Sequence, residues 1–309
     1  MLYLYMDLIA LISDKRTIKQ NSLNSYLTIL KKLNNDDKIL NLDFLKDTDN
    51  ILQKIETKAL TTKKNYLSAV LVTLNAFNKA EFNDAVKVYG DESDKLNDEY
   101  TALIESHEKD PKQKKNWTTV ANLKKAMNRI KRDIDERGIL KKDELNNKEL
   151  HILQHYVIAG LFVLQPPVRL NFNMLVVHKR EDIEDGKNYL LVESRNKKKF
   201  IIADYKTAKT YDTKEMEVNP EINKILNYWL KYNKTGFFLL NTRGGMLSSN
   251  GLSKMITQVF ASTNKHITLN LIRHVYISEN IDIETVNKST QLASDMHHAL
   301  LTQHTYIKV

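Results

Sequence analysis

The chain has 309 residues, of which 42% are hydrophobic and 28% are charged, a balance typical of a soluble globular protein long enough for two domains. Its 47 Lys and Arg against 38 Asp and Glu give a net charge of +9, which suits a polyanion such as DNA but is also common in proteins that bind no nucleic acid. The absence of cysteine excludes disulfides, a thiolate nucleophile and cysteine-based zinc sites, and it favours an intracellular protein that is not secreted. Only 8 Gly and 4 Pro occur, so few turns between strands are expected and a mainly helical fold is predicted.

The N-terminal segment is apolar but is interrupted by Asp7. It lacks a basic leader region and is too short to span a bilayer, so we expect neither a signal peptide nor a membrane partner. Residues 1–13 are predicted to form a helix that packs on the rest of the chain or provides an oligomer contact.

Apolar residues at helical spacing predict four further helices, at about 17–33, 47–55, 61–77 and 91–107. The expected cap of the second helix lies within residues 47–50, and Thr61 or Thr62 is the expected cap of the third. Lys63 and Lys64 fall in the first turn of the third helix, where free backbone N–H groups also favour anions. The alternative for these two lysines is an ordinary solvated helix face.

A polar run, EKDPKQKKN at 108–116, predicts a domain boundary. From Pro111 to Arg132 the chain has no acidic residue, and Trp117 lies within this stretch. Its basic residues are Lys112, Lys114, Lys115, Lys124, Lys125, Arg129, Lys131 and Arg132. A segment whose charges are all positive can bind along a phosphate backbone, although a soluble linker and an exposed helix face have the same composition. We therefore expect a helical unit at 14–110, a basic linker at 111–117 and a second unit at 118–309.

The second unit is predicted to begin with helices at about 118–137 and 145–164, the latter apolar enough to be buried. Pro166 and Pro167 end this buried helix, and Arg169 follows. A guanidinium held there can meet a phosphate with its bidentate fork, or it can pair with a carboxylate in the core.

Short strands are predicted at 188–193, 200–205 and 213–218, with Lys206 and Lys209 in the second turn. Further helices are expected at about 221–232, 250–261, 270–280 and 285–297, and Ser248 or Ser249 is the expected cap of the second of these. The expected fold class is α+β: mainly α with a small three-stranded antiparallel sheet.

Familiar phosphate-binding and hydrolase motifs are missing, since no G-x-x-x-x-G-K-[ST], G-x-G-x-x-G or G-x-S-x-G occurs. Histidines gather near the C-terminus, at His297, His298 and His304, with His266 and His274 upstream. Adjacent histidines on a helix point to different faces, and these five have no H-x-x-x-H spacing or nearby cluster of acids. The spacing therefore does not favour a metal site.

Segments in order along residues 14–309 resemble the boxes of the tyrosine recombinases, the phage-integrase type of DNA breaking and rejoining enzymes. QPPVRLNF at 165–172 resembles the first arginine box, and YKTAK at 205–209 resembles the segment with the active-site lysine. The run at 237–256 resembles the stretch before the second box, and LNLIRH at 269–274 resembles H-x-x-R-H. MHHALLTQHTYIK at 296–308 resembles the ending that carries a histidine and the nucleophilic tyrosine. The resemblance assigns catalytic roles to Arg169, Lys206 (with Lys209 in reserve), Asn270, Arg273, His297 and Tyr306.

This resemblance implies a helical DNA-binding unit at 14–110 and a catalytic unit at 118–309 that close on double-stranded DNA as a clamp. It also implies strand transfer through a 3′-phosphotyrosine, no cofactor and a homotetramer on DNA during exchange. We expect DNA contacts from Lys63, Lys64, Lys112, Lys114, Lys115 and Lys124.

The chain departs from the family pattern at several positions. Asn270 stands where the second box begins with histidine, and an amide can donate a hydrogen bond but cannot exchange a proton near neutral pH. Met296 and His298 replace the usual glycine and serine beside the last histidine, and no carboxylate follows the first arginine box. The tail after Tyr306 is too short for the helix exchange of many relatives, so the N-terminal helix is expected to supply the protomer contact. Two alternatives stay open: a DNA-binding protein of this fold without strand transfer, and a metal-dependent nuclease that uses the C-terminal histidines.

Overall fold

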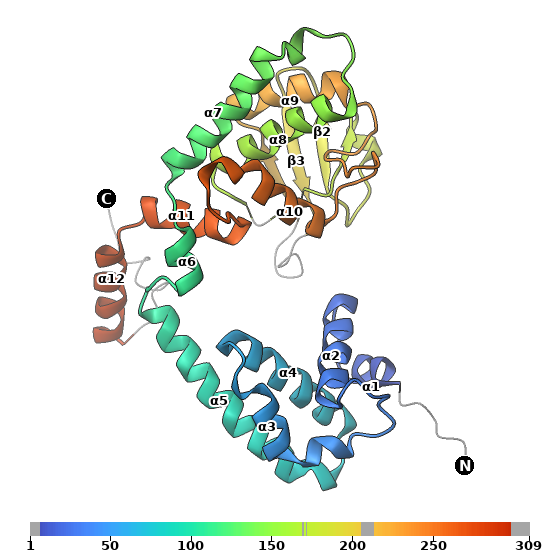
Figure 1. The fold of residues 1–309 in the computed structure, drawn as a ribbon, viewed down its shortest axis with the longest axis vertical. Helices are drawn as coiled ribbons and strands as arrows, with labels where there is room; N and C mark the ends of the chain where they lie inside the picture. The colour runs from blue at the N-terminus through green and yellow to red at the C-terminus, as the bar shows by residue number, and fades with distance from the viewer. Residues whose placement is uncertain (1–6, 169, 171, 205–212, 298–309) are drawn as a thin grey trace. The chain divides into compact units, whose positions relative to one another are not determined.

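The computed structural model describes residues 7–168, 170, 172–204 and 213–297. The chain divides into two compact units, Met1–Glu108 and Lys109–Val309, and each is described by itself (Figure 1). Over the described residues the protein is mainly helical with one small sheet, which confirms the coarse fold class predicted from the sequence. No helix within these ranges is long and apolar enough to cross a membrane.

The first unit is helical, with α1 (Leu8–Lys15), α2 (Gln20–Leu33), α3 (Thr48–Glu56), α4 (Leu60–Phe77) and α5 (Asn83–Glu105). The other four helices contact α4, whose Leu67, Ala69 and Val70 are fully buried. Leu8 and Ile12 of α1 are also buried inside this unit, so this face of the N-terminal helix is already covered within one copy of the chain.

Two helix starts in this unit test the capping residues predicted from the sequence. The Asp47 side chain accepts a hydrogen bond from Asn50 N at 3.3 Å and caps α3 as predicted. The cap predicted at Thr61 or Thr62 is wrong, because α4 already begins at Leu60 and has no side-chain cap.

Two further elements differ from the local sequence signals. Helix α5 begins well before the predicted position 91, because Tyr89 is fully buried and its hydroxyl donates to Leu45 O at 2.8 Å. The segment expected as a linker contains a short helix, α6 (Pro111–Asn116). This helix begins with a capping box, in which Asp110 and Gln113 each bond the backbone of the other through their side chains. A proline in the first helical position suits this start because its missing N–H would have no partner there.

The second unit is built around a buried helix, α8 (Asn147–Val163), as its apolar sequence predicts. The remaining described helices are α7 (Val120–Glu136), α9 (Pro220–Tyr232), α10 (Ser249–Val259), α11 (Leu269–Asn280) and α12 (Ile283–Asp295). Helices α7, α9 and α10 contact α8. Gly160 allows the close approach of α9, because a Cβ there would lie only 2.9 Å from Ile225 Cδ1.

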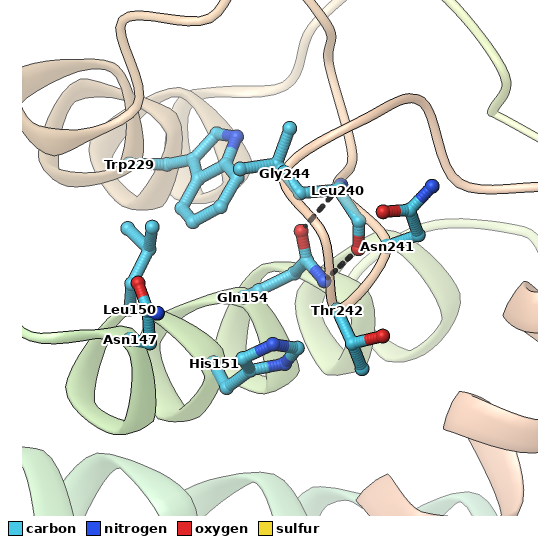
Figure 2. A pocket seen from close by; sticks show the side chains of 9 residues that line it. All are labelled: Asn147, Leu150, His151, Gln154, Trp229, Leu240, Asn241, Thr242 and Gly244. Carbon is cyan, nitrogen blue, oxygen red and sulfur yellow. Dashed lines mark hydrogen bonds between the residues drawn. The ribbon is translucent and has the colours of Figure 1, made fainter.

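A buried polar side chain on α8 fixes the neighbouring chain segment (Figure 2). Gln154 is 1% exposed, accepts from Leu240 N at 2.7 Å and donates to Leu240 O at 2.9 Å. It thus satisfies both backbone groups of a buried residue outside the sheet, where they would otherwise be left unpaired at considerable energetic cost.

The sheet contains β1 (Leu175–Val177), β2 (Tyr189–Val192), β3 (Lys198–Ile202) and β4 (Lys214–Glu217), in that order across the sheet. β2, β3 and β4 are antiparallel and correspond to the three predicted strands. The prediction of a purely antiparallel three-stranded sheet is wrong, because β1 pairs in parallel with β2. β1 has only three residues, too few to show the alternation by which a strand is recognised in a sequence.

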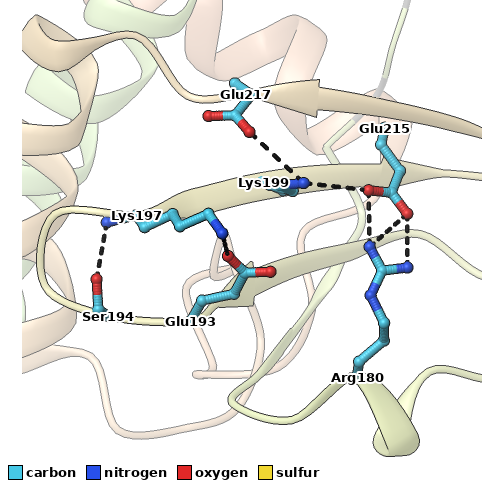
Figure 3. A network of polar contacts seen from close by, with 7 residues as sticks. All are labelled: Arg180, Glu193, Ser194, Lys197, Lys199, Glu215 and Glu217. Atoms are coloured by element: carbon cyan, nitrogen blue, oxygen red, sulfur yellow. Dashed lines mark hydrogen bonds and ion pairs between the residues drawn. The ribbon is translucent and has the colours of Figure 1, made fainter.

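Ion pairs connect the strands near the β2–β3 turn (Figure 3). Arg180 binds both carboxylate oxygens of Glu215 at 2.6 and 2.7 Å. Lys199 lies 3.4 Å from Glu215 and 3.5 Å from Glu217, and Lys197 pairs with Glu193 at 2.7 Å. The charges of Arg180, Lys197 and Lys199 are therefore matched by carboxylates.

Candidate functional site

Helix α11 carries two of the predicted catalytic residues, Asn270 and Arg273. The helix begins after Thr268, whose hydroxyl accepts from Leu271 N at 3.2 Å. Asn270 lies in the first turn and Arg273 one turn later, so the two side chains share a face. The first turn also presents backbone N–H groups that lack partners within the helix, and these favour an anion.

The guanidinium of Arg273 connects the second box to the first. It donates from Nη2 to Val168 O at 3.0 Å and from Nε to Pro167 O at 3.3 Å. It also donates from Nη1 to the amide oxygen of Asn270 at 3.0 Å. Pro167 and Val168 directly precede position 169, so the backbone of the segment 165–172 meets a side chain of the segment 269–274.

A surface depression of about 590 Å³ lies between α10 and the start of α11. It is lined by Ser253, Lys254, Thr257, His266, Thr268, Leu269, Asn270 and Arg273. Among these lining residues there is no carboxylate, and both Lys254 and Arg273 are cations. The depression therefore combines fixed positive charge, hydroxyl groups and a helix N-terminus, which together suit a phosphate.

The basic helix α6 is tied to the loop that leads into this depression. Asn116, the last residue of α6, accepts from His266 N at 2.9 Å, and Lys265 donates to Trp117 O. Glu279 of α11 accepts from Val120 N at 3.0 Å and so satisfies a free N–H at the start of α7. The expected DNA-contacting lysines of this region are all exposed: Lys112, Lys114, Lys115 and Lys124.

The lysines expected to contact DNA from the first unit lie in a different environment. The ammonium of Lys64 is 4.0 Å from the centre of the Tyr100 ring. Lys63 lines a hollow of about 330 Å³ together with Asp49, Glu56 and Glu92.

The two units differ in net charge. Residues 109–309 contain 33 Lys and Arg and 21 Asp and Glu, whereas residues 1–108 contain 14 Lys and Arg and 17 Asp and Glu. The excess positive charge of the protein therefore belongs to the second unit.

The remaining predicted catalytic residues are not brought to this depression by the described part of the chain. His297 follows α12, is exposed and has a φ of 55°, and it is not among the residues that line the depression. Arg169, Lys206 and Tyr306 lie outside the described residues, as does Lys209. Within the described ranges, no three His, Asp or Glu side chains are grouped as ligands of a metal ion.

Of the lining residues, only Asn270 and Arg273 were predicted as site residues; the ones that were missed include two that can carry positive charge, Lys254 and His266. The Ser248 cap of α10 is confirmed by its bond from Gly251 N at 3.1 Å. Helical spacing from that cap places Ser253, Lys254 and Thr257 near one face, so the sequence contained a usable signal for Lys254. His266 precedes α11 in an irregular loop, where no periodicity predicts the direction of a side chain.

Comparison of the chain with models of known protein families gives no match. Comparison with curated proteins likewise finds no match. The functional interpretation therefore depends on the residues of the site and on the motifs in the sequence.

Proposed function

We propose that the protein is a site-specific tyrosine recombinase that cleaves and rejoins duplex DNA through a 3′-phosphotyrosine intermediate. The observation that carries this proposal is the pair of bonds from Arg273 to Pro167 O and Val168 O. These bonds hold two arginine-containing motifs together although they are far apart in the sequence. A reaction at a phosphodiester needs the two segments close together, because an arginine from each can then bind the same phosphate.

In this proposal the arginines stabilise the charge that develops on the phosphate. Attack on a phosphodiester passes through a five-coordinate state with extra negative charge on its nonbridging oxygens. Arg169 and Arg273 would bind these oxygens, with His297 and Asn270 as further donors. The Asn270 oxygen accepts from Arg273, so the Nδ2 group of Asn270 is the part of this side chain that would donate to the phosphate. Removal of one such preorganised donor typically raises the barrier by about 3–4 kcal/mol.

The phenol of Tyr306 acts as the nucleophile. The phenol loses its proton to solvent, and its oxygen forms a bond to phosphorus while the bond from phosphorus to the 5′-oxygen of the next nucleotide breaks. Lys206 donates a proton to that leaving oxygen as the general acid. The phosphotyrosine bond conserves the energy of the broken bond, so attack by a 5′-hydroxyl rejoins the strand without a nucleotide cofactor. The arginines supply the positive charge for which other phosphoryl-transfer enzymes use a metal ion.

The second unit provides most of the DNA-binding charge in this account. The lysines of α6 and Lys124 would bind the phosphates next to the one that occupies the depression. Lys63 and Lys64 would add contacts from the first unit, and exchange between two duplexes would require a homotetramer on DNA. The expected location is inside the cell, where the DNA substrate is found.

A second candidate is a DNA-binding protein of the same design that does not transfer strands. The observation that favours it is the exposed position of His297 outside the depression, together with an asparagine at position 270. Such a protein would use the cationic depression to bind a phosphate without breaking it.

A nicked suicide duplex tests the proposal. The duplex is taken from the DNA that flanks the gene, and the nick lets a short product diffuse away so that the covalent intermediate accumulates. We expect a protein–DNA adduct that survives denaturation, forms in EDTA and is lost in Tyr306→Phe. Tyr26→Phe is the matched control, because Tyr26 lies on α2 of the first unit and lines neither the depression nor any other hollow of the second unit.

The other results would point to the alternatives. Tight and specific binding without an adduct on any of these duplexes would favour the DNA-binding protein. Cutting that needs a divalent metal ion and leaves no adduct would favour a metal-dependent nuclease.

A further inference from the structure

Lys198 is a buried lysine without a carboxylate partner in the described structure. It lies on β3 between Lys197 and Lys199, which both pair with carboxylates (Figure 3), and its side chain has a different environment. Lys198 is 2% exposed, and its ammonium donates to Arg195 O at 2.6 Å, Asn223 Oδ1 at 2.8 Å and Asn227 Oδ1 at 2.7 Å. Its three N–H bonds are satisfied by neutral oxygens, so its positive charge is not neutralised.

The surroundings of Lys198 add more positive charge. Burial lowers the pKa of Lys198, and the charge of Arg195 lowers it further. Neither Arg195 nor the exposed Lys224 of α9 has a carboxylate partner among the described residues. The sequence neighbours Lys197 and Lys199 pair with Glu193, Glu215 and Glu217, whereas Arg195, Lys198 and Lys224 have no carboxylate partner among the described residues.

These cations line a groove of about 1000 Å³ between α7, α9 and the β2–β3 turn. Lys131, Lys231 and His178 also line it, and Glu221 is the one carboxylate among its lining residues. Lys131 is matched by Asp135 at 2.5 Å, but Lys231 donates only to neutral oxygens. The volume is at the upper end of the range of small-ligand sites, about 300–1000 Å³.

Two tyrosines distinguish this groove from a purely electrostatic surface. Tyr156 and Tyr228 both line it, and Tyr228 is 43% exposed. Cations beside exposed aromatic rings are typical of sites for nucleic-acid strands, because phosphates pair with the charges and bases stack on the rings. An acidic peptide would use the cations but would leave the rings without flat partners.

We propose that this groove binds a nucleotide ligand, with its phosphates on Arg195 and Lys224 over the buried charge of Lys198 and its base against Tyr228. The ligand is either a free nucleotide or a short segment of single strand, which share this chemistry. The groove has no lining residue in common with the depression at α11, and it lies at the turn end of β3, opposite the end that leads to residue 204. The inference does not depend on the proposed strand-transfer activity.

The test measures anisotropy of a fluorescent five-nucleotide thymidine strand with the full-length protein, and competition by unlabelled thymidine triphosphate. We expect the double variant Arg195→Gln with Lys224→Gln to bind the strand at least tenfold more weakly than the unaltered protein. The control double variant, Lys148→Gln with Lys288→Gln, loses the same charge at exposed positions outside the groove and should change affinity less than twofold.

Substitution of the ring separates base stacking from charge. Tyr228→Leu should weaken strand binding at least threefold and leave competition by inorganic phosphate unchanged. If thymidine triphosphate displaces the labelled strand efficiently, the groove is a site for free nucleotides. If the strand stays bound at high concentrations of thymidine triphosphate, the groove is a site for single strands. Equal losses in the two double variants would overturn the proposal, as would a hexaglutamate peptide that competes better than thymidine triphosphate.

Discussion

Replacement of Arg273 by lysine tests the contact between α11 and the backbone at Pro167 and Val168. Lysine keeps the positive charge but loses the planar fork, so it cannot reach Val168 O, Pro167 O and Asn270 Oδ1 together. Hydrogen bonds from a charged group contribute about 1.5–3 kcal/mol each. Since Arg273 is half-buried and solvent replaces part of what is lost, we expect Arg273→Lys to lower the free energy of unfolding by about 2 kcal/mol.

For a unit of this size, such a loss corresponds to a decrease in Tm of about 4–8 °C, measurable by circular dichroism during heating. Arg243→Lys is the matched control, because Arg243 is exposed and its substitution should change the free energy of unfolding by less than about 0.5 kcal/mol. If Arg273→Lys and Arg243→Lys unfold at the same temperature, the contact does not hold α11 to the segment at 167–168.

Further predictions concern the core, the pH dependence of stability and DNA affinity. Gln154→Leu leaves the buried N–H and C=O of Leu240 unpaired and should lower the free energy of unfolding by about 2–4 kcal/mol in urea; a loss below 1 kcal/mol would contradict the bonding. Burial, and secondarily the charge of His151, lowers the pKa of His155 to about 4, below its unfolded value of 6.5. Because the unfolded chain then binds the proton more tightly, the free energy of unfolding should fall by about 3 kcal/mol as the pH decreases from 7 to 4, and His155→Gln should remove most of this dependence. Duplex affinity should fall steeply with salt, and changing the three α6 lysines to glutamine should reduce the slope of log Kd against log salt by about 2–3; an unchanged slope would show that α6 does not contact phosphates.

The fold could be predicted from the sequence where a local signal is strong. Asp47 and Ser248 cap helices as their side chains suggest, and α8 is buried as its apolar run requires. The early start of α5 was missed because it depends on burial of Tyr89, a tertiary contact that has no local signature. The parallel strand β1 was missed for the same reason, since its pairing with β2 is decided by the fold rather than by its three residues.

The candidate site shows a similar division. The sequence predicts a helix at about 270–280 that contains Asn270 and Arg273, and the structure places the two side chains in contact. The bonds to Pro167 and Val168 could not be predicted from spacing, because they join segments whose distance is fixed by tertiary packing. The concentration of positive charge in the second unit, by contrast, can be counted from the sequence once the chain is divided at the predicted boundary near residue 108.

The central claim is that the phenol of Tyr306 becomes covalently joined to DNA, and mass spectrometry of the trapped adduct tests it most directly. After nuclease and trypsin digestion, the account predicts nucleotide mass on the peptide 289–308, with fragment ions that place it on Tyr306. An adduct at any other residue, or no adduct on duplexes that the protein binds specifically, would contradict the account.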